Sequence, residues 1–294
     1  MKTFFRNWKS FLLVRVAPCS LAAKGFCILA FAALVCTTIA LAQQPAADKN
    51  QGPASSTKRP PQAKSQKEYA DYNAAAAITG GEATEKAAND FAAKYPDSEL
   101  RVYLYSKAMH EYQNENQPDK MLVVGRKILK LDPDNTIALV LTATVLADSM
   151  KDSDPDHDQK MAEIKINADH ALETVDAAFV APAQATPEQI ADYKSTLRSM
   201  AHSALGIMEL KNADDAGAEK DLKTAADLNK TQPDPYIWYH LALAQDHQKK
   251  YAEALASVDQ ALHYTGSNPD LGKLAAGERE RLAKLAGDPA PPPK

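Results

Sequence analysis

An acidic segment between residues 152 and 163 has the residue types and the spacing of a calcium-binding loop. Its carboxylates stand at the first, third, fifth, seventh and twelfth positions, where such a loop places the hard oxygen ligands that Ca²⁺ prefers. The candidate ligands are Asp152, Asp154, Asp156, Asp158 and Glu163. His157 stands where the loop needs glycine and Pro155 restricts the backbone, so the simpler alternative is a solvated acidic turn before a helix.

The other residue types that carry chemistry do not form a recognisable constellation. No two of the seven histidines have the spacing of a zinc protease, and His240 and His247 share only a predicted helix face. The three cysteines, Cys19, Cys27 and Cys36, would all be lost with an N-terminal signal. The sequence has no phosphate-binding loop and no nucleophile motif. We therefore expect no enzymatic activity, no cofactor and no metal.

The first 42 residues have the pattern of an export signal. Residues 1–25 carry five basic residues and no acid, residues 26–42 are apolar or small, and the run ends in Ala40-Leu41-Ala42. This order predicts a secretory signal peptide that is cleaved after Ala42, and hence a periplasmic or secreted protein. The alternative is an uncleaved anchor through residues 26–42, a length at the lower limit for spanning a bilayer, and only then do we expect membrane contact.

The rest of the chain is acidic and has two segments that are poor in apolar residues. The formal net charge is −4, and the first 42 residues hold five positive charges, so cleavage would leave −9. Phosphate backbones repel such a chain, which excludes nucleic acid as an expected partner. Residues 43–65, rich in Pro, Ala, Gln and Lys, predict a disordered linker, and residues 286–294 predict a disordered Pro-rich tail.

Between these segments, the sequence predicts helical hairpins, and the clearest covers residues 238–264. Trp238, Leu241, Ala242 and Gln245 stand at intervals of three, four and seven, which places them on one face of a helix, and apolar residues recur in the same way within residues 251–262. The polar residues 246–250 are enough only for a tight turn. A hairpin this small leaves one apolar face bare, so it needs a neighbour of the same kind.

This hairpin resembles a tetratricopeptide repeat, a helix–turn–helix unit of 34 residues. The resemblance is carried by Trp238, Leu241, Ala242, Tyr251, Ala254 and Ala261. A second hairpin, within residues 101–135, resembles the repeat through Tyr105, Ala108, Met109 and Tyr112. Gly125 in that hairpin occupies a position that is normally bulky, which predicts either a local gap or a large neighbour leaning in.

The same resemblance extends, less closely, to three further units. The usually small residue early in the second helix, here called the anchor, falls at Thr84, Met121, Ala168, Ala218 and Ala254. The two middle intervals are longer than the repeat, so these units are predicted to be lengthened. Residues 270–285 predict a helix that caps the open end of the stack. The resemblance thus implies an all-α fold, an α-solenoid of about five tetratricopeptide-like hairpins with a C-terminal capping helix over residues 66–285.

The family binds extended peptides in a concave groove that is lined by the first helix of each hairpin. Carried over to this chain, the groove residues are Ser106, His110, Gln113, Asn114, Met200, Ser203, Ile207, Lys211, Tyr236, Tyr239, Leu243, Asp246 and His247. The implied function is a non-catalytic scaffold that binds an unidentified protein or peptide in a bacterial cell envelope or outside the cell. Two alternatives remain, namely a Ca²⁺-responsive module using the acidic segment and a structural protein that forms a homo-oligomer through its loosely fitting first hairpin.

Overall fold

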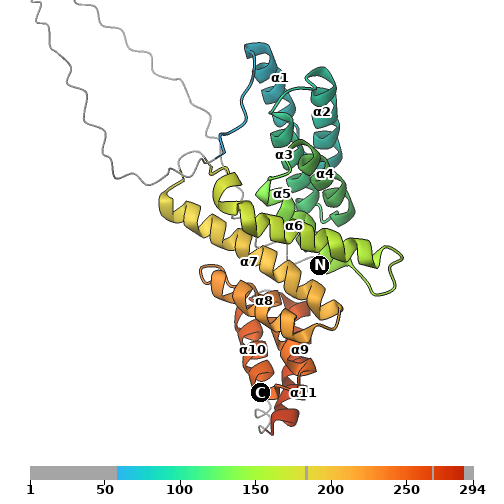
Figure 1. Ribbon diagram of the computed structural model, residues 1–294, viewed down its shortest axis with the longest axis vertical. Coiled ribbons are helices and arrows are strands. Elements are labelled where there is room, and N and C mark those ends of the chain that lie inside the picture. The colour runs from blue at the N-terminus through green and yellow to red at the C-terminus, as the bar shows by residue number, and fades with distance from the viewer. Residues whose placement is uncertain (1–57, 183–184, 267, 288–294) are drawn as a thin grey trace, which may run out of the picture.

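The computed structural model describes residues 58–182, 185–266 and 268–287, and every regular element within these ranges is an α-helix (Figure 1). The helices are α1 (Gln66–Ala76), α2 (Gly81–Lys94), α3 (Arg101–Asn114), α4 (Pro118–Leu131), α5 (Thr136–Ser149), α6 (His157–Ala178), α7 (Pro187–Lys211), α8 (Asp215–Leu228), α9 (Pro235–His247), α10 (Tyr251–Tyr264) and α11 (Pro269–Ala286). The predicted all-α fold is confirmed for these ranges. None of these helices is both long and apolar enough to cross a bilayer. The predicted signal, most of the linker and residues 288–294 of the predicted tail lie outside the described residues.

Ten of the helices form five consecutive hairpins, from α1–α2 to α9–α10, and α11 packs on α10 as the predicted cap. Each helix packs against the next one along the chain, as expected of a solenoid in which a hairpin contacts mainly its neighbours. The stack runs along the long axis of the molecule, with α1 and α2 at one end and α11 at the other (Figure 1).

The five anchor residues form the buried seam of each hairpin. Thr84, Met121, Ala168, Ala218 and Ala254 all have an exposed fraction of 0 or 1%. Four of the anchors lie close to the start of the second helix of their hairpin, whereas Ala168 lies in the middle of the long helix α6. Burial of these side chains places the apolar face of the second helix against the first, and this confirms the register that the sequence predicted.

Three of the hairpins turn through the same backbone motif. Asn116, Ala213 and Lys249 have positive φ values of 55, 58 and 61°. Each stands five residues before the anchor of its hairpin. In the first of these turns the N–H of Gln117 donates to the carbonyl of Tyr112 at 2.9 Å, and the equivalent bond has the same length in the other two. This pattern is the Schellman motif, which satisfies carbonyls at a helix C-terminus through one left-handed residue.

Neighbouring side chains occupy the space beside Gly125, so the missing side chain leaves no gap. A Cβ built on Gly125 would lie 2.6 Å from Thr142 Oγ1 and 3.2 Å from Met109 Cε. The long Met109 side chain of α3 therefore leans toward α4, as one of the two predicted outcomes requires. Gly206 has a comparable role between α7 and α8, since its Cβ would lie 2.6 Å from Leu222 Cγ.

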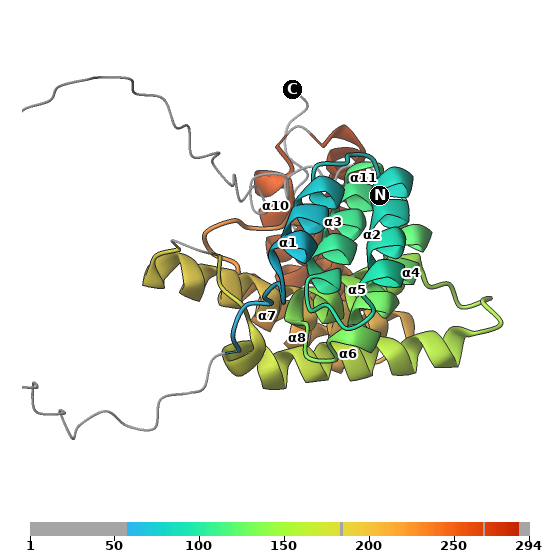
Figure 2. The ribbon, with the colours of Figure 1, turned by 90° about the horizontal axis from the view of Figure 1, so that it is seen from above.

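The two lengthened units meet at the centre of the stack. Helix α6 has 22 residues and α7 has 25, and the N-terminal part of α7 projects beyond the shorter helices (Figure 2). Helix α7 packs not only on α6 and α8 but also directly on α5. As a result α5 is covered by three helices, and 11 of its 14 residues are buried. The extra length that the anchor intervals predicted therefore lies mainly in helices, with a smaller part in the longer turn between α5 and α6, residues 150–156.

Residues 58–65 differ from the prediction of a disordered linker. They run in an extended path over the connections between the first three hairpins. The N–H of Lys58 donates to the carbonyl of Ala177 at 3.0 Å, and the guanidinium of Arg59 binds Glu99. Composition predicted this segment wrongly because its polar groups have specific partners in the folded hairpins.

We predict that Ala213→Gly stabilises the protein by about 0.5–1 kcal/mol. A residue with a Cβ is destabilised by about 1–2 kcal/mol in the left-handed conformation, and glycine relieves this strain. The greater backbone freedom of glycine in the unfolded chain offsets part of the stabilisation. Urea unfolding followed by circular dichroism measures the difference. The matched control is Ala256→Gly, at an exposed site inside α10, which should destabilise by about 1 kcal/mol. Equal losses in both variants would contradict the role of the turn.

Candidate partner-binding surface

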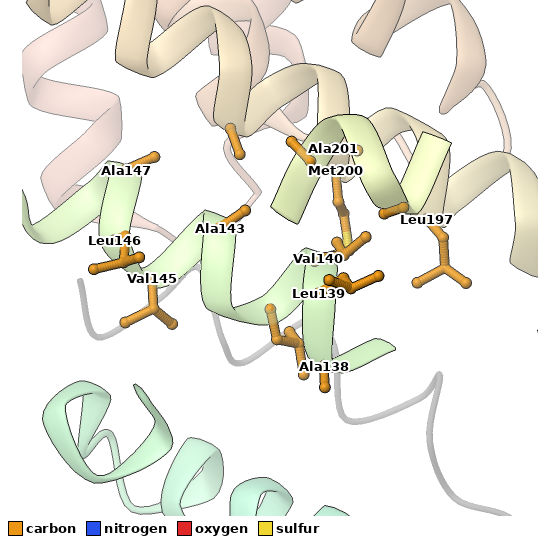
Figure 3. Close-up of a cluster of buried hydrophobic side chains, with 14 of the residues drawn as sticks. Ala138, Leu139, Val140, Ala143, Val145, Leu146, Ala147, Leu197, Met200 and Ala201 are labelled. Atoms are coloured by element: carbon orange, nitrogen blue, oxygen red, sulfur yellow. The ribbon is translucent and has the colours of Figure 1, made fainter. Parts of the chain in front are cut away.

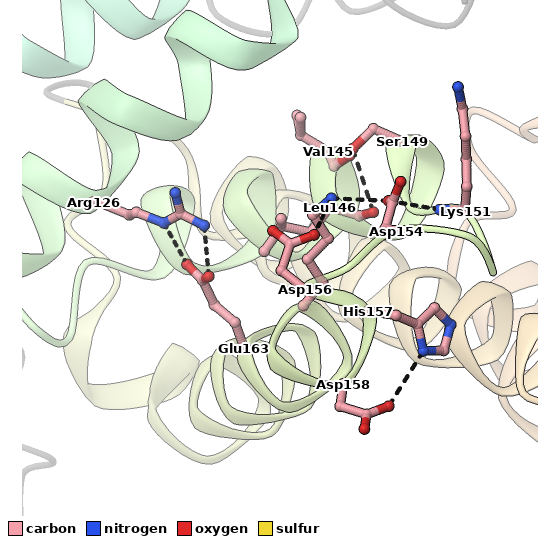
Figure 4. Close-up of polar contacts among 11 residues, drawn as sticks. Arg126, Val145, Leu146, Ser149, Lys151, Asp154, Asp156, His157, Asp158 and Glu163 are labelled. Atoms are coloured by element: carbon pink, nitrogen blue, oxygen red, sulfur yellow. Dashed lines mark hydrogen bonds and ion pairs between the residues drawn. The ribbon is translucent and has the colours of Figure 1, made fainter.

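The acidic segment does not bring its carboxylates together around a cation. The ammonium of Lys160 lies 2.8 Å from Asp154 Oδ2 and 2.9 Å from Asp156 Oδ1, so a side chain of the same segment already pairs with both acids (Figure 4). Glu163 instead faces α4, where Arg126 donates to both of its oxygens at 2.8 and 2.6 Å.

The remaining predicted calcium ligands point into solvent. Asp152 is exposed, and the side chain of Asp158 is fully exposed, with its oxygen 3.4 Å from His157 Nδ1 (Figure 4). Within the described ranges, no three His, Cys, Asp or Glu side chains are arranged to hold a metal. The described geometry therefore gives no support to the calcium alternative, because Glu163 pairs with Arg126 of α4 and the acids of the segment do not converge on one point.

The predicted groove residues of the second hairpin lie on the outward side of α3, with one exception. Ser106 and His110 are partly exposed, and Asn114 is exposed. Gln113 is buried, with an exposed fraction of 3%, and its Oε1 lies 3.2 Å from His110 Nδ1. Gln113 is therefore not accessible to a partner. Its side chain instead orients the imidazole of His110.

The predicted groove residues of the fourth hairpin are not accessible. Met200, Ser203 and Ile207 have exposed fractions of 8, 7 and 5%. Figure 3 shows Met200 of α7 extending toward Val140 of α5, among labelled Ala, Leu and Val side chains. These three residues were wrongly predicted as groove residues because α7 lies directly on α5, so the face that would line a groove forms the core instead.

Lys211, the fourth predicted residue on α7, ties two helices together. Its ammonium donates to the carbonyls of Ala147, Asp148 and Met150 at 2.6, 3.2 and 2.7 Å. These carbonyls belong to the C-terminal end of α5, where a positive charge is favourable. Burial lowers the pKa of Lys211. Since all three donors of the ammonium have acceptors, Lys211 stabilises the α5–α7 contact and is not available to a partner.

The predicted residues of the fifth hairpin include the largest accessible aromatic side chains of the set. Tyr236, Tyr239 and Leu243 are partly exposed along α9. Tyr236 is oriented by Asn268, whose Nδ2 donates to the phenol oxygen at 3.1 Å. Tyr239 packs against the apolar cluster under α10 and α11, and burial raises its pKa. Both rings are therefore held in place while part of each remains exposed.

The two charged or titratable residues predicted at the end of α9 are engaged with neighbouring helices. Asp246 forms an ion pair with Arg281 of the capping helix. His247 is half-exposed, and its Nδ1 lies 2.8 Å from Asp215 Oδ1. Asp246 is thus used to fix α11 on α9, whereas His247 remains accessible beside Leu243.

Three tyrosines at the N-terminal end were not among the predicted site residues. Tyr69 is 55% exposed and stacks on Tyr72, with ring centroids 6.3 Å apart. Tyr103 of α3 is partly exposed. The pKa of Tyr72 is raised mainly by burial and, to a smaller extent, by the nearby Tyr103. Tyr103 stands at the same place in its hairpin as Tyr236 does in the fifth, two residues before the aromatic that begins the repeat pattern. That equivalence is the signal that could have identified it.

The accessible residues therefore form two separate surfaces. The N-terminal surface consists of Tyr69, Tyr72, Tyr103, Ser106, His110 and Asn114 on α1 and α3. The C-terminal surface consists of Tyr236, Tyr239, Leu243 and His247 on α9. The two lie toward opposite ends of the stack, and α5 and α7 come between them (Figure 1). The predicted single set of groove residues is thus divided by the central helices.

A titratable cluster lies between α7 and α8, beside the α5–α7 junction. The pKa of Glu209 is raised to about 7, mainly by burial and then by the nearby Asp221 and Asp214, while Lys165 of α6 opposes the shift. His202 Nδ1 lies 2.7 Å from Asp221 Oδ1. The protonated form of Glu209 is therefore favoured in the folded state relative to the unfolded chain.

We predict that Glu209→Gln stabilises the protein at pH 8 and has little effect at pH 5. In the wild type, Glu209 binds its proton more tightly in the folded than in the unfolded chain, and this difference stabilises the folded state. The stabilisation is complete below the pKa that Glu209 has in the unfolded chain, and it is lost as pH rises through about 7. Allowing for solvent screening, the variant should gain about 1–2 kcal/mol on the wild type between the two pH values. Denaturant unfolding of both proteins at pH 5 and pH 8 measures this gain. The same difference in unfolding free energy at both pH values would contradict a role for the titration of Glu209.

We also predict that millimolar Ca²⁺ leaves thermal unfolding of the protein unchanged. A ligand that binds only the folded state raises the unfolding temperature, and the ligand set needed for Ca²⁺ is not assembled here. The variant Asp154→Asn is the control, since it should also show no response to Ca²⁺. A rise in the wild type that the variant lacks would restore the calcium alternative.

Comparison with known proteins gives a likeness in structure and none in sequence. No protein-family model matches the chain, and no curated protein sequence matches it. Among solved structures, the chain is similar to a thermophilic TPR protein of Thermus thermophilus, with 16% sequence identity and a TM-score of 0.44. The alignment covers 72% of this chain and 98% of the other. At this identity and TM-score the likeness does not define a function.

Proposed function

We propose that the protein is a non-catalytic scaffold that binds a protein or peptide partner on the exposed sides of the helices that open its hairpins. The observation that carries this proposal is the C-terminal surface, where Tyr236 and Tyr239 present rigid aromatic rings beside Leu243 and His247. Tyrosines of this kind are enriched at protein interfaces, because they offer large contact areas with little loss of side-chain freedom.

The division into two surfaces bears on how such a partner binds. The N-terminal surface also carries aromatic rings, with Tyr69 and Tyr72 stacked and Tyr103 beside them. Between the surfaces, the face of α7 is occupied by its contact with α5. A partner therefore contacts one end of the stack, or uses two separate segments to contact both, and does not follow one uninterrupted groove.

The same proposal places the protein outside the cytoplasm of a bacterium. It rests on the basic region, the apolar run and the Ala40-Leu41-Ala42 site, which together are typical of a secretory signal. In this proposal the partner is a component of the cell envelope or an extracellular protein. Retention of residues 26–42 would attach the scaffold to the membrane instead, and N-terminal sequencing of the exported protein distinguishes the two.

We predict that a photo-crosslinking amino acid at position 239 gives a discrete product with a partner from the cell envelope. The ring at this position is partly exposed on the C-terminal surface, so a bound partner lies within reach of the probe. The matched control carries the same probe at Val123, which is 52% exposed on α4 and away from both surfaces, and it should give no such product.

The products of this experiment separate the scaffold from its alternatives. A product at 239 that is lost when Tyr236→Ala is added supports the C-terminal surface. A product of twice the chain mass would support self-association instead. Equal labelling at positions 123 and 239, or no product at either, would count against the proposed surface.

A further inference from the structure

We propose that residues 58–65 form a releasable strap, which holds the start of the chain against the side of the solenoid and sets where the upstream residues leave the body. The strap crosses the connections of the first three hairpins. In Figure 1 it descends from α1 toward the region where α6 ends and α7 begins. The chain therefore enters the folded body beside α6, and not at α1, where the stack begins.

The fixed points of the strap are polar and come from four different parts of the fold. The N–H of Lys58 donates to the carbonyl of Ala177 at the end of α6 at 3.0 Å, and its ammonium pairs with Asp132 between α4 and α5. The guanidinium of Arg59 donates to both oxygens of Glu99, between α2 and α3, at 2.8 and 2.6 Å.

The same glutamate also holds the backbone of the strap. The N–H of Gln62 donates to Glu99 Oε2 at 3.2 Å. Two residues later, the N–H of Lys64 donates at 2.6 Å to Glu68 of α1. Glu99 thus binds the strap through a side chain and through an amide, and it is the residue whose charge the closed form most depends on.

The local sequence makes the strap extended and inexpensive to order. Pro60 and Pro61 fix their own φ angles, and each disfavours a helical conformation in the residue before it. Of the eight residues, Ala63 is the one that packs on the apolar core, while Arg59, Gln62 and Lys64 are exposed. A segment with restricted backbone freedom and little apolar contact can close and open without unfolding the hairpins beneath it.

The ion pair between Arg59 of the strap and Glu99 is of a kind that salt weakens. The side chains of Arg59 and Glu99 are 63 and 42% exposed. Exposed ion pairs are screened by ions and contribute little individually. Release of the strap would move the point at which the chain leaves the folded body from α6 to Ser65, at the start of α1. The eight released residues could span at most about 26–29 Å from that point. The strap therefore determines both the position and the reach of whatever precedes it.

Hydrogen exchange of the full-length chain tests the strap, with the amides of Gln62 and Lys64 as reporters. In Glu99→Gln we expect peptides covering residues 58–68 to exchange roughly tenfold faster than in the wild type, while peptides from α3 to α5 are unchanged. Raising NaCl from about 0.05 to about 0.5 M should have the same local effect on the wild type. Circular dichroism of the variant confirms that its helices remain folded.

The matched control is Glu163→Gln, which removes the charge from another two-bond pair, with Arg126, that does not involve the strap. It should leave exchange of residues 58–68 as in the wild type. Unchanged exchange of the strap in Glu99→Gln would overturn the proposal. Faster exchange throughout α3 to α5 would also overturn it, because the segment would then be an inseparable part of the fold.

Discussion

The structure depends on the need of each helical hairpin to cover an apolar face that it cannot bury alone. Each hairpin buries its own anchor between its two helices. The other face of the hairpin is also apolar, and only the next hairpin covers it. A helix of 14 residues gains most of its stability from such packing. The requirement is strongest at α5, where helices on three sides cover 11 of 14 residues and leave little polar surface. The position of α7, and with it the division of the accessible surface, follows from the need to cover α5.

Periodicity together with the resemblance to the tetratricopeptide repeat predicted the elements of this fold. Apolar residues at helical intervals identified the hairpin at 238–264, and the resemblance extended the prediction to the other hairpins through anchors such as Ala218. The long middle intervals correctly indicated lengthened units. The path of residues 58–65 was missed, since a composition rich in Pro and Lys carries no sign of the partners that Glu99 and Ala177 provide across 40 and more than 100 positions of sequence.

The candidate site was less predictable, because it depends on which faces the neighbours leave uncovered. Tyr239 and His247 follow the repeat pattern and are accessible, whereas Met200 and Ile207 follow the same pattern and are buried. The difference arises because α7 lies directly on α5, and this tertiary contact has no local sequence signal. Lys211 shows the same limit. Its charge suggested recognition of a partner, but three carbonyls of the α5 C-terminus are its acceptors.

The turns at Asn116, Ala213 and Lys249 share one further property. An amide, a methyl group and a long cation adopt the same left-handed backbone there, and the bond that closes each turn joins main-chain atoms only. The joint between paired helices is thus closed by peptide groups, and side chains of different chemistry are accommodated there at a steric cost. Such a joint allows the residue at its apex to drift in sequence while the pitch of the superhelix is preserved. Proline is incompatible with it, because a pyrrolidine ring can supply neither the positive φ nor the N–H, and β-branched side chains are strongly disfavoured at this φ.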